Sequence, residues 1–193
     1  MKKNELKNLV IAAMLLATGL VLPFLTGQIQ QIGNMLLPMH FPVILCGLIC
    51  GWKYGLGVGF ILPVLRSAIF GMPVMYPNAF AMAFELAAYG FFVGFLFSHA
   101  KWQCIKSLYR CLIISMLLGR VVWGVVMTII LGLGADGFTL TAFLTSAFFN
   151  AIPGIIAQLV LIPAIMLALD KTHFVRFKNT KCKMPDARYQ MPE

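Results

Sequence analysis

Apolar residues are gathered into long, continuous blocks along the chain. These blocks cover 8–25, 36–50, 55–70, 79–98, 109–134 and 141–169. Because the apolar positions run without a period-two alternation, they favour membrane-spanning helices over a membrane β-barrel. Crossing the ~30 Å hydrocarbon core takes about 20 residues of helix, so the chain has room for about six spans and little else. We predict an all-α bundle of six transmembrane helices that forms a single domain over residues 1–170.

The stretch 36–70 is too long for one span and short for two. Gly51-Trp52-Lys53-Tyr54-Gly55 interrupts it with two glycines around a lysine, which is a turn signal. Two helices meeting there would each be about 22 Å long at 1.5 Å per residue. Helices of that length require local thinning of the bilayer or insertion of a loop. The alternative, a single span, would bury Lys53, so the sequence favours two short helices.

Composition agrees with the membrane as the solvent. Hydrophobic residues make up 61% of the chain and charged residues only 11%, against about 25% charged residues in soluble domains. This excludes a soluble enzyme, a disordered chain and a disulfide-stapled secreted domain. The five cysteines show no CxxC or Cys/His spacing, so we expect neither a disulfide framework nor a metal site.

The net charge of +9 raises the question of nucleic acid as a partner. The basic residues instead lie in short patches between apolar blocks, as they do in membrane proteins. With six helices and a cytoplasmic N-terminus, all the Lys and Arg residues except Arg66 and Arg120 lie on the cytoplasmic side. The positive-inside rule therefore predicts that both termini, including a basic tail over 171–193, are cytoplasmic.

Apart from Arg110, which lies at the cytoplasmic end of its block, three charged residues lie inside the predicted spans: Arg66, Glu85 and Arg120. Each costs on the order of 3 kcal/mol to insert, so such residues are candidates for function. Counting along the helices places all three, with Asn150, in the outer half of the bilayer. Convergence of polar groups from four helices is typical of a small-molecule site. The alternative is that Glu85 only pairs with an arginine to hold the bundle together.

Helical phase adds neighbours to these residues. Glu85 shares a face with Asn78 and Tyr89, and Arg120 shares one with Trp123. Asn150 shares a face with Gly154, and Gln158 lies one turn deeper; for Asn150 and Gln158, hydrogen bonding between helices is an equally good interpretation. The predicted substrate-binding residues are Arg66, Asn78, Glu85, Tyr89, Arg120, Trp123 and Asn150.

Two external connections are candidate lids. Residues 26–37 are polar but uncharged, and residues 71–78 hold two prolines, two methionines and a tyrosine. Such segments can close over a pocket, although ordinary surface loops explain them equally well. We predict that Asn34, His40 and Tyr76 belong to these gates; the alternative for His40 is a histidine that begins a helix at the membrane interface.

No energy source for transport is visible in the sequence. The chain has no phosphate-binding loop, no obvious inverted repeat, and no metalloprotease or serine–histidine motif. A binding pocket without such a source indicates a partner protein. Ala13 and Ala17 in the first block form a small-xxx-small pair that would let another helix approach, although such pairs commonly serve internal packing.

These features together resemble the substrate-binding S component of an energy-coupling factor (ECF) vitamin transporter. The resemblance covers about residues 8–170. It rests on the six short helices, Ala13-x3-Ala17, Leu37-Pro38-Met39-His40-Phe41-Pro42 followed by Gly51-Trp52-Lys53-Tyr54-Gly55, and Gly119-Arg120-Val121-Val122-Trp123-Gly124.

The resemblance implies a multi-pass protein of the bacterial cell membrane that binds a vitamin-like nutrient. It also implies that Ala13 and Ala17 contact a transmembrane T component, which two cytoplasmic ATPases drive. The binding protein would then topple in the membrane to carry its site inward. We expect no catalytic activity, no cofactor, no metal and no nucleic-acid partner.

The predicted substrate is small and anionic or amphoteric. Arg66 and Arg120 against Glu85 leave one positive charge, which a carboxylate would complement. A pantothenate-like molecule is the first choice and a pyridine or pterin vitamin the second. The chain departs from the family in that the signatures of thiamine, riboflavin and biotin binders are not evident. Two other classes stay open: a stand-alone channel or exporter, which needs a polar path through the inner half, and a membrane enzyme, which needs a nucleophile–base pair.

Overall fold

The computed structural model describes residues 3–26, 38–100, 105–132 and 152–171. The predicted site residues Asn34 and Asn150 lie outside these residues. So do most of the first predicted lid and the predicted basic tail beyond residue 171.

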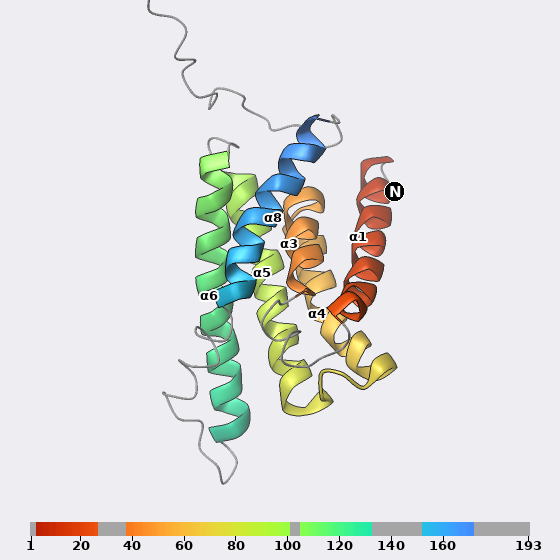
Figure 1. Cartoon of the computed structure of the whole chain (residues 1–193), viewed down its shortest axis with the longest axis vertical. Coiled ribbons are helices and arrows are strands. Elements are labelled where there is room, and N and C mark those ends of the chain that lie inside the picture. The colour runs from red at the N-terminus through yellow and green to blue at the C-terminus, as the bar shows by residue number, and fades with distance from the viewer. Residues whose placement is uncertain (1–2, 27–37, 101–104, 133–151, 172–193) are drawn as a thin grey trace, which may run out of the picture.

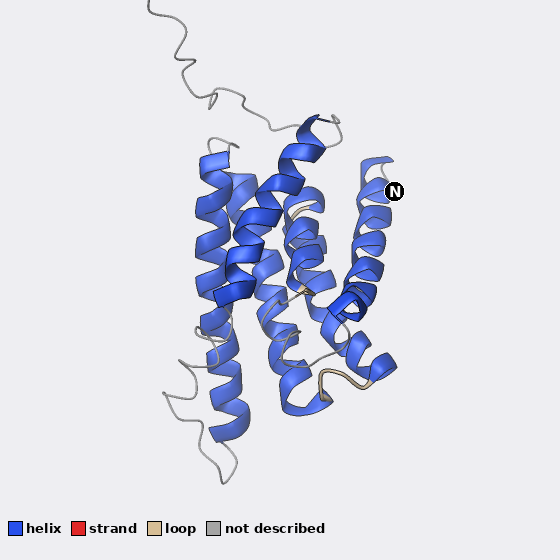
Figure 2. Ribbon diagram, viewed as in Figure 1, coloured by secondary structure: helices blue, strands red, loops and turns tan. Residues whose placement is uncertain are grey.

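The described residues are helical almost throughout and contain no strand (Figure 2). Within the described residues, α-helices occur in all six apolar blocks, which confirms the all-α prediction. Short helical turns, η1 and η2, follow α1 and precede α5. The elements are α1 (Lys3–Val21), η1 (Leu22–Thr26), α3 (His40–Cys50), α4 (Trp52–Phe70), η2 (Met75–Ala79), α5 (Phe80–His99), α6 (Ile105–Gly132) and α8 (Ile152–Lys171).

Four of the helical segments are long and apolar enough to cross a membrane: Glu5–Phe24, Trp52–Phe70, Met75–His99 and Ile105–Ile130. The segments His40–Cys50 and Gly154–Leu169 are apolar but shorter. In Figure 1, α3 and α8 begin near the mid-height of α6 and run to the end of the bundle at which α1 begins. We call this end the N-terminal end.

The turn between α3 and α4 lies at the N-terminal end and consists of Gly51 alone. Its φ of 93° lies in the left-handed region, where glycine carries no steric penalty. The prediction of two helices within 36–70 is confirmed. Lys53 lies in the first turn of α4 and is exposed, and α3, with 11 residues, is only about 16 Å long.

Glycines bring α3, α4 and α5 into backbone contact. A Cβ atom on Gly55 of α4 would lie 2.7 Å from the Cα of Gly47 on α3 and 2.7 Å from the carbonyl oxygen of Gly90 on α5. A Cβ atom on Gly90 would meet the carbonyl of Gly55 more closely still. Close approach through small residues is the usual way that membrane helices gain packing energy. These three helices therefore form the tight centre of the bundle.

A second packing region joins α3 and α5 to α6 and α8. Its buried apolar residues form one cluster toward the N-terminal end of the bundle. The members that matter for the site are Ile44, Tyr89, Met116 and Ile162.

Candidate functional site

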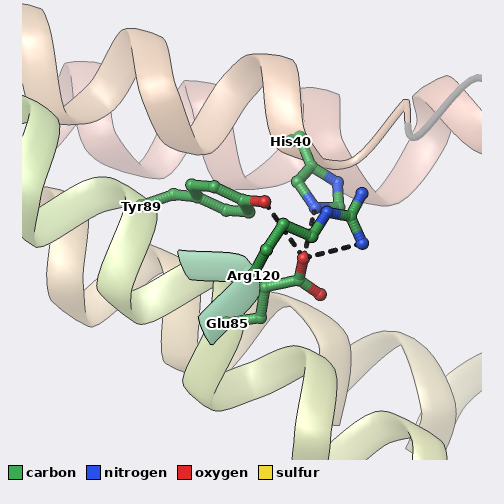
Figure 3. A network of polar contacts seen from close by, with 4 residues as sticks. All are labelled: His40, Glu85, Tyr89 and Arg120. Carbon is green, nitrogen blue, oxygen red and sulfur yellow. Dashed lines mark hydrogen bonds and ion pairs between the residues drawn. The ribbon is translucent and has the colours of Figure 1, made fainter. Parts of the chain in front are cut away.

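Four polar side chains from three helices meet inside the bundle: His40 of α3, Glu85 and Tyr89 of α5, and Arg120 of α6 (Figure 3). They are 1%, 2%, 2% and 7% exposed, respectively. The carboxylate oxygen Oε1 of Glu85 lies 3.1 Å from Nη1 of Arg120 and accepts a hydrogen bond from the Tyr89 hydroxyl at 3.1 Å. The same oxygen is 3.8 Å from Nε2 of His40, which is too far for a hydrogen bond.

The position of this cluster follows from helix periodicity. His40, Glu85 and Arg120 each lie four residues, about one turn, from the core residues Ile44, Tyr89 and Met116. On every one of these helices the step from the apolar to the polar residue leads away from the N-terminal end (Figure 1). The three helices thus present a polar layer directly beyond the apolar core.

Gly119 makes room for the ring that completes the cluster. A Cβ atom at this position would lie 2.6 Å from Cε1 of Tyr89. The Tyr89 ring therefore packs against bare backbone beside Arg120, and its hydroxyl reaches Glu85 one turn away on its own helix.

The ion pair with Glu85 uses Nη1, one of the three guanidinium nitrogens of Arg120. Its Nε and Nη2 atoms are buried and have no hydrogen-bond partner among the described residues, and the same holds for both ring nitrogens of His40. Nε and Nη2 lie on one edge of the guanidinium, the edge that binds a carboxylate with two parallel hydrogen bonds. Buried polar groups in proteins nearly always have a partner, so these atoms mark a place where a polar ligand would be held.

Arg66 lies apart from the cluster. Its Nη1 donates a hydrogen bond to the carbonyl oxygen of Leu20 at 2.8 Å. Its guanidinium carbon lies 5.4 Å from the ring centroid of Phe24 and 5.7 Å from that of Phe70. The structure therefore places this arginine at the end of α1, where it satisfies a carbonyl that the helix leaves open.

The comparisons with known proteins decide the family. The model of the substrate-specific component of ECF transporters matches residues 7–166. The chain belongs to this family. None of the curated proteins and none of the solved structures matches it. Such components are parts of transporters rather than enzymes; they bind small substrates and work with T and ATPase components.

The small residues of α1 in this S component divide between two faces. Ala12 is 4% exposed and packs in the core, and Gly19 lies against the side chain of Leu62. Ala13 and Ala17 are both exposed. Ala13 and Ala17 thus face away from the bundle.

The remaining predicted residues of the S component differ in their exposure. Trp123, half-buried, follows Arg120 on the same face of α6, and Asn78 is half-buried in η2. Tyr76 is 64% exposed and lines an apolar groove of about 540 Å³ between η2, α5 and α6. His40 begins α3 as expected, but its burial shows that it is not an exposed interfacial residue.

One buried polar residue was not among the predicted binding residues. Gln158 of α8 is 1% exposed, and neither atom of its amide group has a hydrogen-bond partner among the described residues. The sequence predicts the face of the helix on which Gln158 lies, but it does not predict which helices pack against that face. Hydrogen bonding between helices is therefore the alternative for Gln158. No such bond is found within the described part of the chain.

Proposed function

We propose that this S component binds a small water-soluble nutrient carrying a carboxylate, pantothenate-like in chemistry, for ATP-driven import. The open Nε/Nη2 edge of Arg120 carries the proposal. This edge is buried, and the bond from Arg120 to Glu85 holds the guanidinium in place between α6 and α5. The edge therefore offers two parallel N–H donors that are already oriented for a carboxylate.

The charge of the cluster differs from the charge that the sequence predicted, because Arg66 lies outside the cluster. Without Arg66, the formal charges of Arg120 and Glu85 cancel, and the expected excess positive charge is not present in the cluster. A ligand carboxylate would then lie beside a neutral ion pair. Hydroxyl or N–H groups on the ligand would compensate the Glu85 carboxylate, which favours a polar, hydroxyl-bearing acid over a simple anion. A pyridine or pterin vitamin is the second choice.

The proposed orientation has six spans and both termini in the cytoplasm. Its support is the shared end of the bundle at which α1 and α6 begin and α3 gives way to α4 (Figure 1). Lys7, Lys53, Lys106 and Arg110 all lie in the first turns of helices that begin there. This concentration of positive charge is what the cytoplasmic side requires.

The proposed partner surface is the outward face of α1 around Ala13 and Ala17. Their exposure leaves a shallow, methyl-lined strip on which a helix of the T component could pack closely. Two cytoplasmic ATPases would drive that component. Residues 26–37 and 71–78, with Asn34, His40 and Tyr76, are proposed as the gates of the binding site.

Mass spectrometry of small molecules released from the detergent-purified protein tests the substrate. We expect a carboxylic acid of vitamin size at close to one molecule per chain. A released compound without an acidic group would contradict the proposed role of Arg120. Uptake by vesicles that contain this chain but no T component would instead favour a stand-alone transporter.

A further inference from the structure

Gln158 lies at the depth of the polar layer. Its helix, α8, packs against α6 and α3, and Ile162, one turn further along, belongs to the same core cluster as Ile44, Tyr89 and Met116. On α8 the step from Ile162 back to Gln158 leads away from the N-terminal end, as the corresponding steps do on the other three helices (Figure 1). Four helices therefore each place one polar residue a single turn beyond the same apolar cluster.

The amide of Gln158 has a defined chemical capacity. Nε2 offers two N–H donors and Oε1 accepts hydrogen bonds. Both atoms are buried without a partner in the described residues. By contrast, the buried Ser115 of the neighbouring helix α6 donates its hydroxyl to the Leu112 carbonyl at 2.9 Å. A side chain kept only for packing at this depth would be better replaced by an apolar one of equal size.

We infer that Gln158 is a substrate-recognition residue, and that the polar layer selects a ligand with a carboxylate for Arg120 and an adjacent donor–acceptor pair for Gln158. A hydroxyl beside an amide carbonyl is such a pair: the hydroxyl would donate to Oε1 and the carbonyl would accept from Nε2. A simple fatty or aromatic acid meets only half of this requirement. The inference rests on the proposed function and narrows its substrate class to hydroxylated N-acyl amino acids.

The test compares two compounds and two variants of the full-length protein in detergent. The compounds are pantothenate, which carries a hydroxyl beside its amide carbonyl, and the analogue in which hydrogen replaces that hydroxyl. The variants are Gln158→Leu and the control Ser115→Ala, which removes a buried hydroxyl from the neighbouring helix α6. Affinity is measured by calorimetric titration, and the melting temperature of the ligand-free protein is recorded for each variant.

We expect wild type and Ser115→Ala to bind pantothenate about tenfold or more tightly than the analogue, the value of a well-made hydrogen bond. Gln158→Leu should bind pantothenate about tenfold more weakly than wild type and should no longer distinguish the two compounds. Its melting temperature should stay the same or rise, because an unpartnered buried amide has been removed.

Two results would overturn the inference in distinguishable ways. If Gln158→Leu binds pantothenate like wild type, or melts lower while still preferring pantothenate, Gln158 is structural and the proposed function is unaffected. If the wild-type protein does not bind pantothenate at all, the substrate class is wrong for the whole site. Assembly with a T component would still test the transport role separately.

Discussion

Arg120→Lys separates the ion pair that Arg120 forms with Glu85 from the carboxylate binding that we propose for its Nε and Nη2. The guanidinium uses Nη1 for the ion pair with Glu85 at 3.1 Å and leaves the Nε/Nη2 edge open. A lysine ammonium can replace the first interaction, because it also carries a positive charge on a long side chain. It cannot replace the second, because it has no planar pair of parallel donors. The variant should therefore stay folded and lose affinity.

The expected loss is that of one of the two parallel hydrogen bonds, because a lysine ammonium has three N–H donors and can still give one to the ligand. A charge-assisted hydrogen bond contributes about 1.5–3 kcal/mol, and about 1.4 kcal/mol corresponds to a tenfold change in Kd. Arg120→Lys should weaken the binding of a carboxylate ligand by about tenfold to a hundredfold. Arg120→Ala is a poorer test, because it leaves the buried Glu85 carboxylate unpaired at a cost of about 3–5 kcal/mol. That variant loses stability and affinity together.

The assay is calorimetric titration of the purified protein with pantothenate, together with its melting temperature. Arg110→Lys is the matched control, since Arg110 lies on the same helix but is exposed. The control should bind and melt like wild type. If Arg120→Lys keeps wild-type affinity and melts lower, Arg120 stabilises the fold and does not bind the carboxylate of the ligand.

Three further predictions address the packing, the partner and the orientation. Gly90→Ala should lower the free energy of unfolding by about 1–3 kcal/mol, because its Cβ would meet the Gly55 backbone. Gly57→Ala has nothing within 4 Å of the added atom and should raise the free energy of unfolding by about 0.5–1 kcal/mol. Equal effects of the two substitutions in thermal or denaturant unfolding would refute the close packing of α3, α4 and α5. Ala17→Trp should abolish co-purification with a T component while leaving pantothenate binding by the isolated chain within about twofold, because the proposed partner surface on α1 faces away from the bundle. Lys53→Cys should react with a membrane-impermeant maleimide only after cells are opened.

Two controls sharpen the last two experiments. Val160→Trp adds the same bulk at an exposed position of α8 and should leave assembly intact; if it also blocks co-purification, bulk anywhere on the surface is harmful and Ala17 is not specific. For the labelling, Tyr76→Cys in the exposed η2 should react in intact cells. Labelling of Lys53→Cys from outside would reverse the proposed topology.

The sequence predicted the helices better than it predicted their ends. The described part of every apolar block is α-helical, or nearly so, because the hydrophobic periodicity and the glycine turn at Gly51 are local signals. One block was expected to begin at residue 109, whereas α6 begins at Ile105. A run of apolar residues does not indicate where a helix starts, because the helix can continue past the run into the polar residues that flank it.

The site was predicted along each helix but not between helices. The spacing of Glu85 and Tyr89 showed that they share a face, and Figure 3 shows that they interact. The pairing of Glu85 with Arg120 was one of two options, because the relative rotation of α5 and α6 depends on tertiary packing. Gln158 was left undecided for the same reason, since the depth of α8 against α6 is set by the shared core residues.

Arg66 and Arg120 differ in their surroundings, and this difference is why we propose a binding role for Arg120 and not for Arg66. Both are buried, and both lie in the part of the sequence where an ionisable residue is a functional candidate. Arg66 meets its requirement with the Leu20 carbonyl and two aromatic rings, none of which a charge pattern in the sequence can reveal. Arg120 pairs with Glu85 through Nη1, but its Nε and Nη2, like polar atoms of His40 and Gln158, have no hydrogen-bond partner in the part of the chain that the structure describes. An arginine that only stabilises the bundle has no need of free N–H donors. A site that takes up and releases a carboxylate requires them.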